Sequence, residues 1–275
     1  MINALIGDKI AIVSDKAQTT RNRIICVYTD EEKQIVFMDT PGVHKPKHKL
    51  GEFMVDAAIE SLKETEAVLF VVAGNEKRGP GDNFIIEQLK RVKVPVFLVV
   101  NKIDTLQKEQ VLEAIVSYQD AYPFAGVIPI SAKNKENLSE LLTVLGEHLP
   151  EGPQYFPEDM ITDQPERLII SDIVREKILL STRDEIPHAI AVDVDEMKTR
   201  DDGTTYIRAT IYCERDSQKG IIIGNKGALL RKIGAEARMD IQKLLATKVY
   251  LDLWVKVKKD WRNKSGMLSE LGYKK

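Results

Sequence analysis

Three short polar motifs in the sequence have the residue types needed to recognise a guanine nucleotide. The first, NKID (101–104), directly follows the apolar run PVFLVV. The Asp104 carboxylate can accept both the N1–H and the 2-amino donors of guanine, while Asn101 braces the loop and the Lys102 stem stacks on the ring. Such a paired site rejects a wrong base by roughly 10⁴-fold. The alternative is a strand-to-helix turn with Asp104 as a helix N-cap.

The second motif, Ser131-Ala132-Lys133, follows the next apolar run, GVIPI. The Ala132 backbone N–H can donate to guanine O6, and the Lys133 side chain can cover the other face of the ring. Because ligands of parallel sheets bind at the carboxyl ends of the strands, we interpret the first two motifs as one guanine site.

The third motif, DTPG, supplies Asp39, Thr40, Pro41 and Gly42, with Val43 behind it. Asp39 at a strand end can hold Mg²⁺ through water, and the Gly42 N–H can approach a γ-phosphate. We expect a second Mg²⁺ ligand from Thr20, favoured over Thr19 in the polar run 15–23. The alternative interpretation of DTPG is a tight turn, and the alternative interpretation of the run 15–23 is an ordinary polar loop.

The basic run HKPKHKL (44–50) is either a solvated loop or a nucleotide-gated contact surface.

A separate signal predicts RNA binding in the second half. The loop Gly224-Asn225-Lys226-Gly227 has two glycines that let backbone amides approach a sugar-phosphate chain. Residues 217–275 also hold 14 Lys and Arg against 5 Asp and Glu, which indicates a polyanion partner or a solvated basic face. Ile222 and Ile223 offer a platform for unstacked bases. Trp254 and Trp261 could also stack on bases, but Trp254 alternates with core residues in its strand and is expected to pack in the core. The predicted RNA-binding residues are Lys219, Ile222, Ile223, Gly224, Asn225, Lys226, Gly227 and Arg231.

The elements around these motifs change character near the middle of the chain. Strands alternating with helices over the first half predict an α/β fold with a mostly parallel sheet. A segment with four of the 11 prolines then interrupts the alternation, and an α-β-β-α-α-β order follows it. The predicted domains are 1–148 and 166–275, joined by a linker at 149–165.

The composition excludes several classes of protein. With 43% hydrophobic and 30% charged residues, the chain is expected to be globular, soluble and cytoplasmic. Its longest apolar run, 67–74, is far below the ~20 residues that span a bilayer. We read no secretory signal at its start, and we expect Cys26 and Cys213 to be buried, reduced thiols.

Taken together, these motifs resemble the Era family of bacterial RNA-binding GTPases with a type-2 KH domain. The resemblance covers DTPG, NKID, SAK, HKPKHKLG, LPEGPQYFP, GIIIGNKG and KVYLDLWVKVKKDWR, and runs through nearly all of the sequence. It implies a P-loop-NTPase-like domain that uses GTP, GDP and Mg²⁺, followed by the RNA-binding domain. It also implies a monomer that binds the 3′ end of 16S rRNA and the 30S subunit, in the cytoplasm and peripherally on the inner face of the membrane.

The resemblance also raises an expectation about phosphate binding. In the family, MINALIG would be the helix after the Walker A loop, and the sequence contains no GxxxxGK[ST]. Each charge-assisted hydrogen bond missing there costs about 1.5–3 kcal/mol, so we expect impaired GTP binding and hydrolysis. We also expect two strand edges without partners inside the sheet. Val43 stands where many GTPases carry a water-positioning Gln, so the catalytic group is unknown. The alternative is a nucleotide-independent KH protein whose first half is a degenerate remnant or a dimerisation surface.

Overall fold

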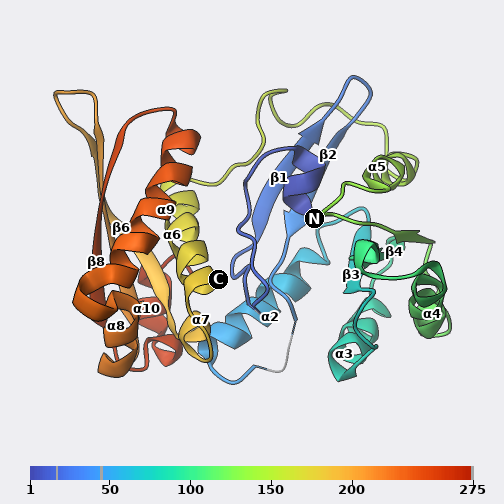
Figure 1. Ribbon diagram of the computed structural model, residues 1–275. Helices are drawn as coiled ribbons and strands as arrows, with labels where there is room; N and C mark the ends of the chain where they lie inside the picture. Colours follow the sequence, from blue (N-terminus) through green and yellow to red (C-terminus); the bar gives the residue numbers. More distant parts are fainter. Residues whose placement is uncertain (17, 44–45, 274–275) are drawn as a thin grey trace. The chain divides into compact units, whose positions relative to one another are not determined.

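The computed structural model describes residues 1–16, 18–43 and 46–273 (Figure 1). The chain divides into two compact units. The N-terminal unit contains Met1–Ile10, Arg23–Lys45 and Val55–Asp163, and the C-terminal unit contains Ala11–Asn22, Pro46–Met54 and Gln164–Lys275. The predicted domain boundaries, which follow the sequence, stay a prediction, because these units are defined by contacts in space.

The N-terminal unit begins with helix α1 (Ile2–Ile6) and the hairpin of β1 (Ile24–Thr29) and β2 (Gln34–Asp39). The hairpin is antiparallel, with Ile24 opposite Asp39. Its turn is closed by the Asp30 carboxylate, which accepts hydrogen bonds from the backbone N–H groups of Glu32 and Lys33, both at 2.9 Å. These bonds, the one from Glu32 above all, lower the pKa of Asp30 to about 2.

A parallel three-stranded sheet forms the rest of this unit. Its strands are β3 (Val68–Ala73), β4 (Val96–Asn101) and β5 (Gly126–Pro129), in that spatial order. The helices that alternate with them are α2 (Lys49–Ser61), α3 (Pro80–Leu89), α4 (Lys108–Gln119) and α5 (Leu138–Gly146). The first part of α2, residues 49–54, groups with the C-terminal unit. Residues 96–100 of β4 are all buried, which suits a central strand of a parallel sheet. The α/β prediction is confirmed.

The strands of the N-terminal unit belong to two sheets. Among the described residues, β2 pairs only with β1, and β3 pairs only with β4. The expectation of two strand edges without partners inside one sheet stays a prediction.

The C-terminal unit has a second three-stranded sheet, in the order β6-β7-β8. Strand β6 (Ala191–Thr199) is antiparallel to β7 (Thr205–Cys213), and β7 is parallel to β8 (Val249–Val257). The helices are α6 (Glu166–Ser181), α7 (Ile186–Ala189), α8 (Asp216–Ile223), α9 (Ala228–Leu245) and α10 (Ser265–Glu270). The predicted α-β-β-α-α-β order is confirmed, and the short helices α7 and α10 are additions to it.

The core of this unit lies between one face of its sheet and the long helices. It includes Val174 and Ile178 of α6, Ile207 of β7 and Ile241 of α9, all fully or almost fully buried. Figure 1 shows the long helices α6 and α9 running beside this sheet. No helix in the described part of the chain is long and apolar enough to cross a membrane.

The segment Ala11–Asn22 is held in the C-terminal unit through a buried arginine. The Arg21 guanidinium donates to the carbonyl oxygens of Ile190 at 2.6 Å and of Pro187 and His188 at 3.3 Å. It also lies 5.9 Å from the ring centroid of Trp261. Burial lowers the pKa of Arg21, and hydrogen bonding to three carbonyls compensates for removing its charge from water.

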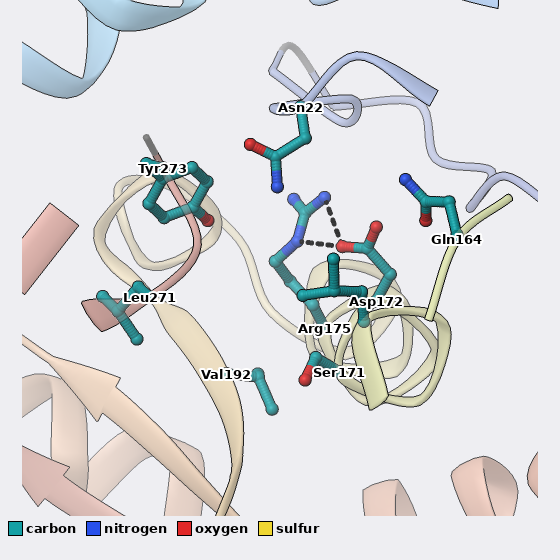
Figure 2. Close-up of a pocket in the computed structure, with 9 residues that line it drawn as sticks. Asn22, Gln164, Ser171, Asp172, Arg175, Val192, Leu271 and Tyr273 are labelled. Carbon is teal, nitrogen blue, oxygen red and sulfur yellow. Dashed lines mark hydrogen bonds and ion pairs between the residues drawn. The ribbon is translucent and has the colours of Figure 1, made fainter. Parts of the chain in front are cut away.

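A second arginine, Arg175 of α6, holds the same segment. It donates to the backbone carbonyls of Gln18 and Thr19 and pairs with Asp172, 3.0 Å away. Figure 2 shows this pair in a pocket whose lining includes Asn22 and Tyr273. Arg175 therefore binds the main chain of the segment, whereas Arg21, a side chain of the segment itself, binds main-chain carbonyls in and directly after α7.

The segment Pro46–Met54 is held in the C-terminal unit by apolar contacts. Leu50 and Met54 are fully buried in a cluster with Trp261, Leu268 and Leu271. The backbone N–H of residue 49 donates to the Asn263 side chain at 3.2 Å. The sequence reading did not predict that either N-terminal segment belongs to this unit.

Both cysteines are free and buried. Burial raises the pKa of the Cys26 thiol to about 12. The predicted buried, reduced thiols are confirmed.

We predict that Arg21→Ala lowers the free energy of unfolding by about 1.5–3 kcal/mol, because three buried carbonyls lose a charged donor. The matched control is Arg238→Ala, at an exposed position of α9, which should change stability by less than about 0.5 kcal/mol. Urea unfolding followed by circular dichroism measures both. Equal effects of the two substitutions would show that Arg21 contributes no special anchoring.

Candidate functional sites

The parallel pairing of β4 with β5 brings two of the predicted motifs together. Val100 lies opposite Pro129, and the Ile130 N–H donates to the Val100 carbonyl at 2.8 Å. The Ile103 N–H donates back to the Ile130 carbonyl at 3.3 Å. The loops that carry NKID and SAK therefore lie side by side at the carboxyl ends of their strands.

Asn101 ties these two loops to each other. Its side-chain oxygen accepts hydrogen bonds from the backbone N–H of Lys102 at 2.7 Å and of Ala132 at 3.1 Å. Lys102 has a positive φ of 69°, which turns the chain sharply after β4. The geometry is that of the predicted brace, while contact of Ala132 or Lys102 with a base stays a prediction.

Ser131 orients the Asp104 carboxylate. The Ser131 hydroxyl donates to Asp104 Oδ1 at 2.7 Å and accepts from the Asn134 N–H at 3.0 Å. Ser131 is fully buried, so the structure gives it an orienting position behind the carboxylate. Lys133 is largely exposed, with its Nζ 3.9 Å from Asp104 Oδ2.

The N-cap alternative for Asp104 does not hold. The N-caps of the short 3-10 helix Ile103–Thr105 and of α4 are Lys102 and Gln107. A fixed carboxylate with remaining acceptor capacity, beside a braced loop, fits the N1–H and 2-amino donors of guanine.

Sequence reasoning missed two residues that shape this site. Gly74, directly after β3, donates its N–H to the Asn101 carbonyl at 2.8 Å. A Cβ there would lie 2.9 Å from Val100 Cγ1, so a side chain would push the loops apart. Asn134, which fixes Ser131, is the second. For Gly74, the signal in the sequence was the dipeptide Gly74-Asn75 at the end of the apolar run 67–73.

DTPG lies in the N-terminal unit at the end of β2. Asp39 is the last residue of the strand, Pro41 is buried and Gly42 is exposed. No atom lies within 4 Å of a Cβ built on Gly42, so the side of the residue on which a side chain would lie is open. The roles of Asp39, Thr40, Pro41, Gly42 and Val43 toward phosphate stay predictions.

The second predicted Mg²⁺ ligand belongs to the other unit. Thr20 lies in Ala11–Asn22, which groups with the C-terminal unit, whereas Asp39 belongs to the N-terminal unit. The neighbouring Thr19 hydroxyl donates to the Lys16 carbonyl at 2.7 Å. The Thr20 and Asp39 pair stays a prediction. In the basic run 44–50, His44 and Lys45 lie outside the described residues.

The predicted GxxG loop joins α8 to α9. Gly224 and Gly227 have φ values of 72° and 77°. A Cβ on Gly224 would lie 2.8 Å from the Cβ of Leu229, so only glycine fits there. Lys226 is exposed at the tip, and its carbonyl accepts from Arg231 Nη2 at 3.2 Å.

The apolar platform predicted beside this loop needs correction. Ile222 is fully buried in the core and Ile223 packs against it, because the helix α8 turns these side chains toward the sheet. The exposed neighbour is Ile221 (53% exposed). The expectation for Trp254 was also wrong: it is 53% exposed, while Trp261 is fully buried.

Comparisons with known proteins match both halves of the chain. A family model described as "50S ribosome-binding GTPase" matches residues 1–102, and one described as "KH domain" matches residues 185–262. GTPase Era of Alkaliphilus metalliredigens is 55% identical over 99% of this chain and 93% of that relative.

Two solved structures have the same fold along nearly the whole chain. One is Era in complex with MgGDPNP and nucleotides 1506–1542 of 16S ribosomal RNA, at TM-score 0.96 and 41% identity. The other is a tyrosine-to-alanine variant of Aquifex aeolicus Era bound to GDP·AlF4⁻, at TM-score 0.95 and 41% identity. Each covers 99% of this chain, and this chain covers 93% of each.

We predict that Asp104→Asn weakens binding of a guanine nucleotide by about 10–100-fold and raises the preference for a xanthine nucleotide. Xanthine has a carbonyl oxygen where guanine has its 2-amino group, so it pairs with an amide donor. Competition of GDP and XDP against a fluorescent nucleotide measures the ratio of dissociation constants. Asp120→Asn, at an exposed position after α4, should leave that ratio unchanged. An unaltered ratio in Asp104→Asn would remove this residue from the base site.

Proposed function

The chain belongs to the Era family of GTPases, and we propose that it is a GTP-dependent RNA-binding switch in assembly of the small ribosomal subunit. The observation that carries the proposal is the presence, in one chain, of a braced guanine-type loop pair and a GxxG loop between two helices. A relative of the same fold has been crystallised with both MgGDPNP and 16S ribosomal RNA.

The nucleotide we propose is GTP, hydrolysed to GDP. Asp104, oriented by Ser131, would pair with the base, and Asn101 would hold the loops around it. Asp39 and Thr20 would hold Mg²⁺, which when bound neutralises charge on the phosphates. The Gly42 N–H would contact the γ-phosphate. No residue is assigned as the catalytic group.

The RNA partner we propose is the 3′ end of 16S rRNA within the 30S subunit. The positive φ angles at Gly224 and Gly227 shape the tight loop between α8 and α9 to which a sugar-phosphate chain would bind. Two basic side chains would contact phosphates. They are Lys226, exposed at the tip of the loop, and Arg231, whose guanidinium donates to the Lys226 carbonyl. The complex of the relative with nucleotides 1506–1542 supports this choice of RNA.

We further propose a monomer in the cytoplasm that also associates peripherally with the inner face of the membrane. The excess of Lys and Arg over residues 217–275 supports contact with an anionic surface. For domain organisation we retain 1–148 and 166–275 with a linker at 149–165.

The decisive experiment is RNA affinity in three nucleotide states. Purified protein is titrated into a labelled RNA with the sequence of the 16S 3′ end, without nucleotide, with GDP and with a non-hydrolysable GTP analogue at saturating concentration. We expect tighter binding with the analogue, because the two nucleotides stabilise different states of one switch. Equal affinity in all three states would support a nucleotide-independent KH protein instead.

We predict that Lys226→Asp weakens binding to this RNA at least about tenfold and lowers the slope of log K against log salt by about 1. The control is Lys90→Asp, the same charge change at an exposed residue of the N-terminal unit, which should bind nearly as the wild type does. Gly224→Asp should also lose binding, partly because the new Cβ collides with Leu229. Full affinity in Lys226→Asp would remove the loop tip from the interface.

A further inference from the structure

The sheet of the C-terminal unit has one face in the core and one outer face. Ile207 and Ile211 of β7 and Val255 of β8 point to the core with α6, α8 and α9. The outer face is covered at one end, where Tyr212 packs with the cluster that contains Trp261. The opposite end of the outer face carries a group here called the aromatic platform. Its members are Tyr206, Tyr250, Trp254, Lys198, Arg200 and Arg208.

The two tyrosines of the platform lie next to each other. Tyr206 and Tyr250 are partners in the parallel β7–β8 register, and their rings are stacked with centroids 5.9 Å apart and planes 16° apart. The Arg200 guanidinium lies over both rings, 4.8 Å from one centroid and 4.9 Å from the other. Lys198 and Arg208 approach Tyr206 at 5.4 and 5.7 Å.

Asp252 fixes the orientation of the platform. Its Oδ2 accepts from the Tyr206 hydroxyl at 3.0 Å, from Trp254 Nε1 at 3.1 Å and from Arg208 Nε at 3.4 Å. Partial burial alone would raise the pKa of Asp252, but these hydrogen bonds lower it below its usual value. The carboxylate therefore stays charged and holds the aromatic rings and one guanidinium in place.

Two of the three aromatic side chains of the platform stay exposed to solvent despite the neighbouring cations. Tyr206, which the three cations and Tyr250 surround, is only 7% exposed, but Tyr250 and Trp254 are each 53% exposed. Lys198 and Arg208 form ion pairs with Glu196. Arg200 makes no ion pair in the part of the chain that the structure describes, so its N–H donors are available to an anion.

We propose that the aromatic platform is a second RNA-binding site, which stacks unpaired bases on Tyr250 and Trp254 and pairs Arg200 with a phosphate. Exposed aromatic faces beside arginine are the combination that binds single strands irrespective of sequence, since every base has a π-face. An acidic peptide would satisfy Arg200 but would leave the rings without stacking partners. The site is distinct from the GxxG loop, whose helices α8 and α9 pack on the other face of the sheet.

The test uses the complete protein and a fluorescein-labelled 12-nucleotide oligouridylate. Tyr250→Ala/Trp254→Ala should weaken binding at least about tenfold, through loss of base stacking. The matched control is Tyr155→Ala, an exposed aromatic residue of the N-terminal unit (78% exposed), which should not change affinity. Arg200→Ala should lower the slope of log K against log salt by about 1. Unchanged thermal unfolding of each variant shows that it folds.

Tryptophan fluorescence gives an independent readout. The protein has 2 tryptophans, and because Trp261 is fully buried, acrylamide quenching reports on Trp254. Oligouridylate should protect Trp254 from quenching, in the wild type and also in Lys226→Asp, whose GxxG loop is disabled. Full affinity in the double variant overturns the proposal. So does unprotected Trp254 at saturating RNA, or protection by polyglutamate alone.

Discussion

The side-chain oxygen of Asn101 is the acceptor on which the base site depends. By binding the N–H groups of Lys102 and Ala132, it holds together two loops that follow different strands. The loops are neighbours only because β4 and β5 run parallel with Val100 opposite Pro129. That pairing in turn rests on a fully buried apolar strand, so the chemistry at the sheet edge is set by the hydrophobic pattern below it.

This dependence explains how much could be predicted from the sequence. The spacing of apolar residues indicated the helices and strands. Polar residues that directly follow apolar parallel strands must lie at the same edge of the sheet. The grouping of Ala11–Asn22 with the C-terminal unit had no such signal. It rests on contacts such as that of Arg21 with Ile190, which join positions far apart in sequence. Because Arg21 stands in a polar run, the sequence alone indicates a solvated side chain there.

The errors about individual side chains have a common physical origin. Alternation along β8 separates two faces but does not say which face the helices cover. Trp254 shares its face with Tyr250 and Lys256, both exposed, and that neighbourhood was the available signal. Trp261 is buried by α10 and by Leu50, which only the folded chain brings together. Similarly, which isoleucine of α8 faces the core depends on the rotation of the helix, and that is set by packing.

The same alternation links the core of the C-terminal unit to its outer surface. The pairs Ile207–Leu251 and Ala209–Leu253 fix the β7–β8 register from inside, and this register places Tyr206 opposite Tyr250 and Arg208 opposite Asp252. A slip by one residue would exchange the two faces, so apolar burial strongly disfavours it. The geometry of the aromatic platform is therefore fixed by residues that never touch its ligand. Substitutions on the outer face can change what is bound there while the core, and with it the position of the GxxG loop, stays the same.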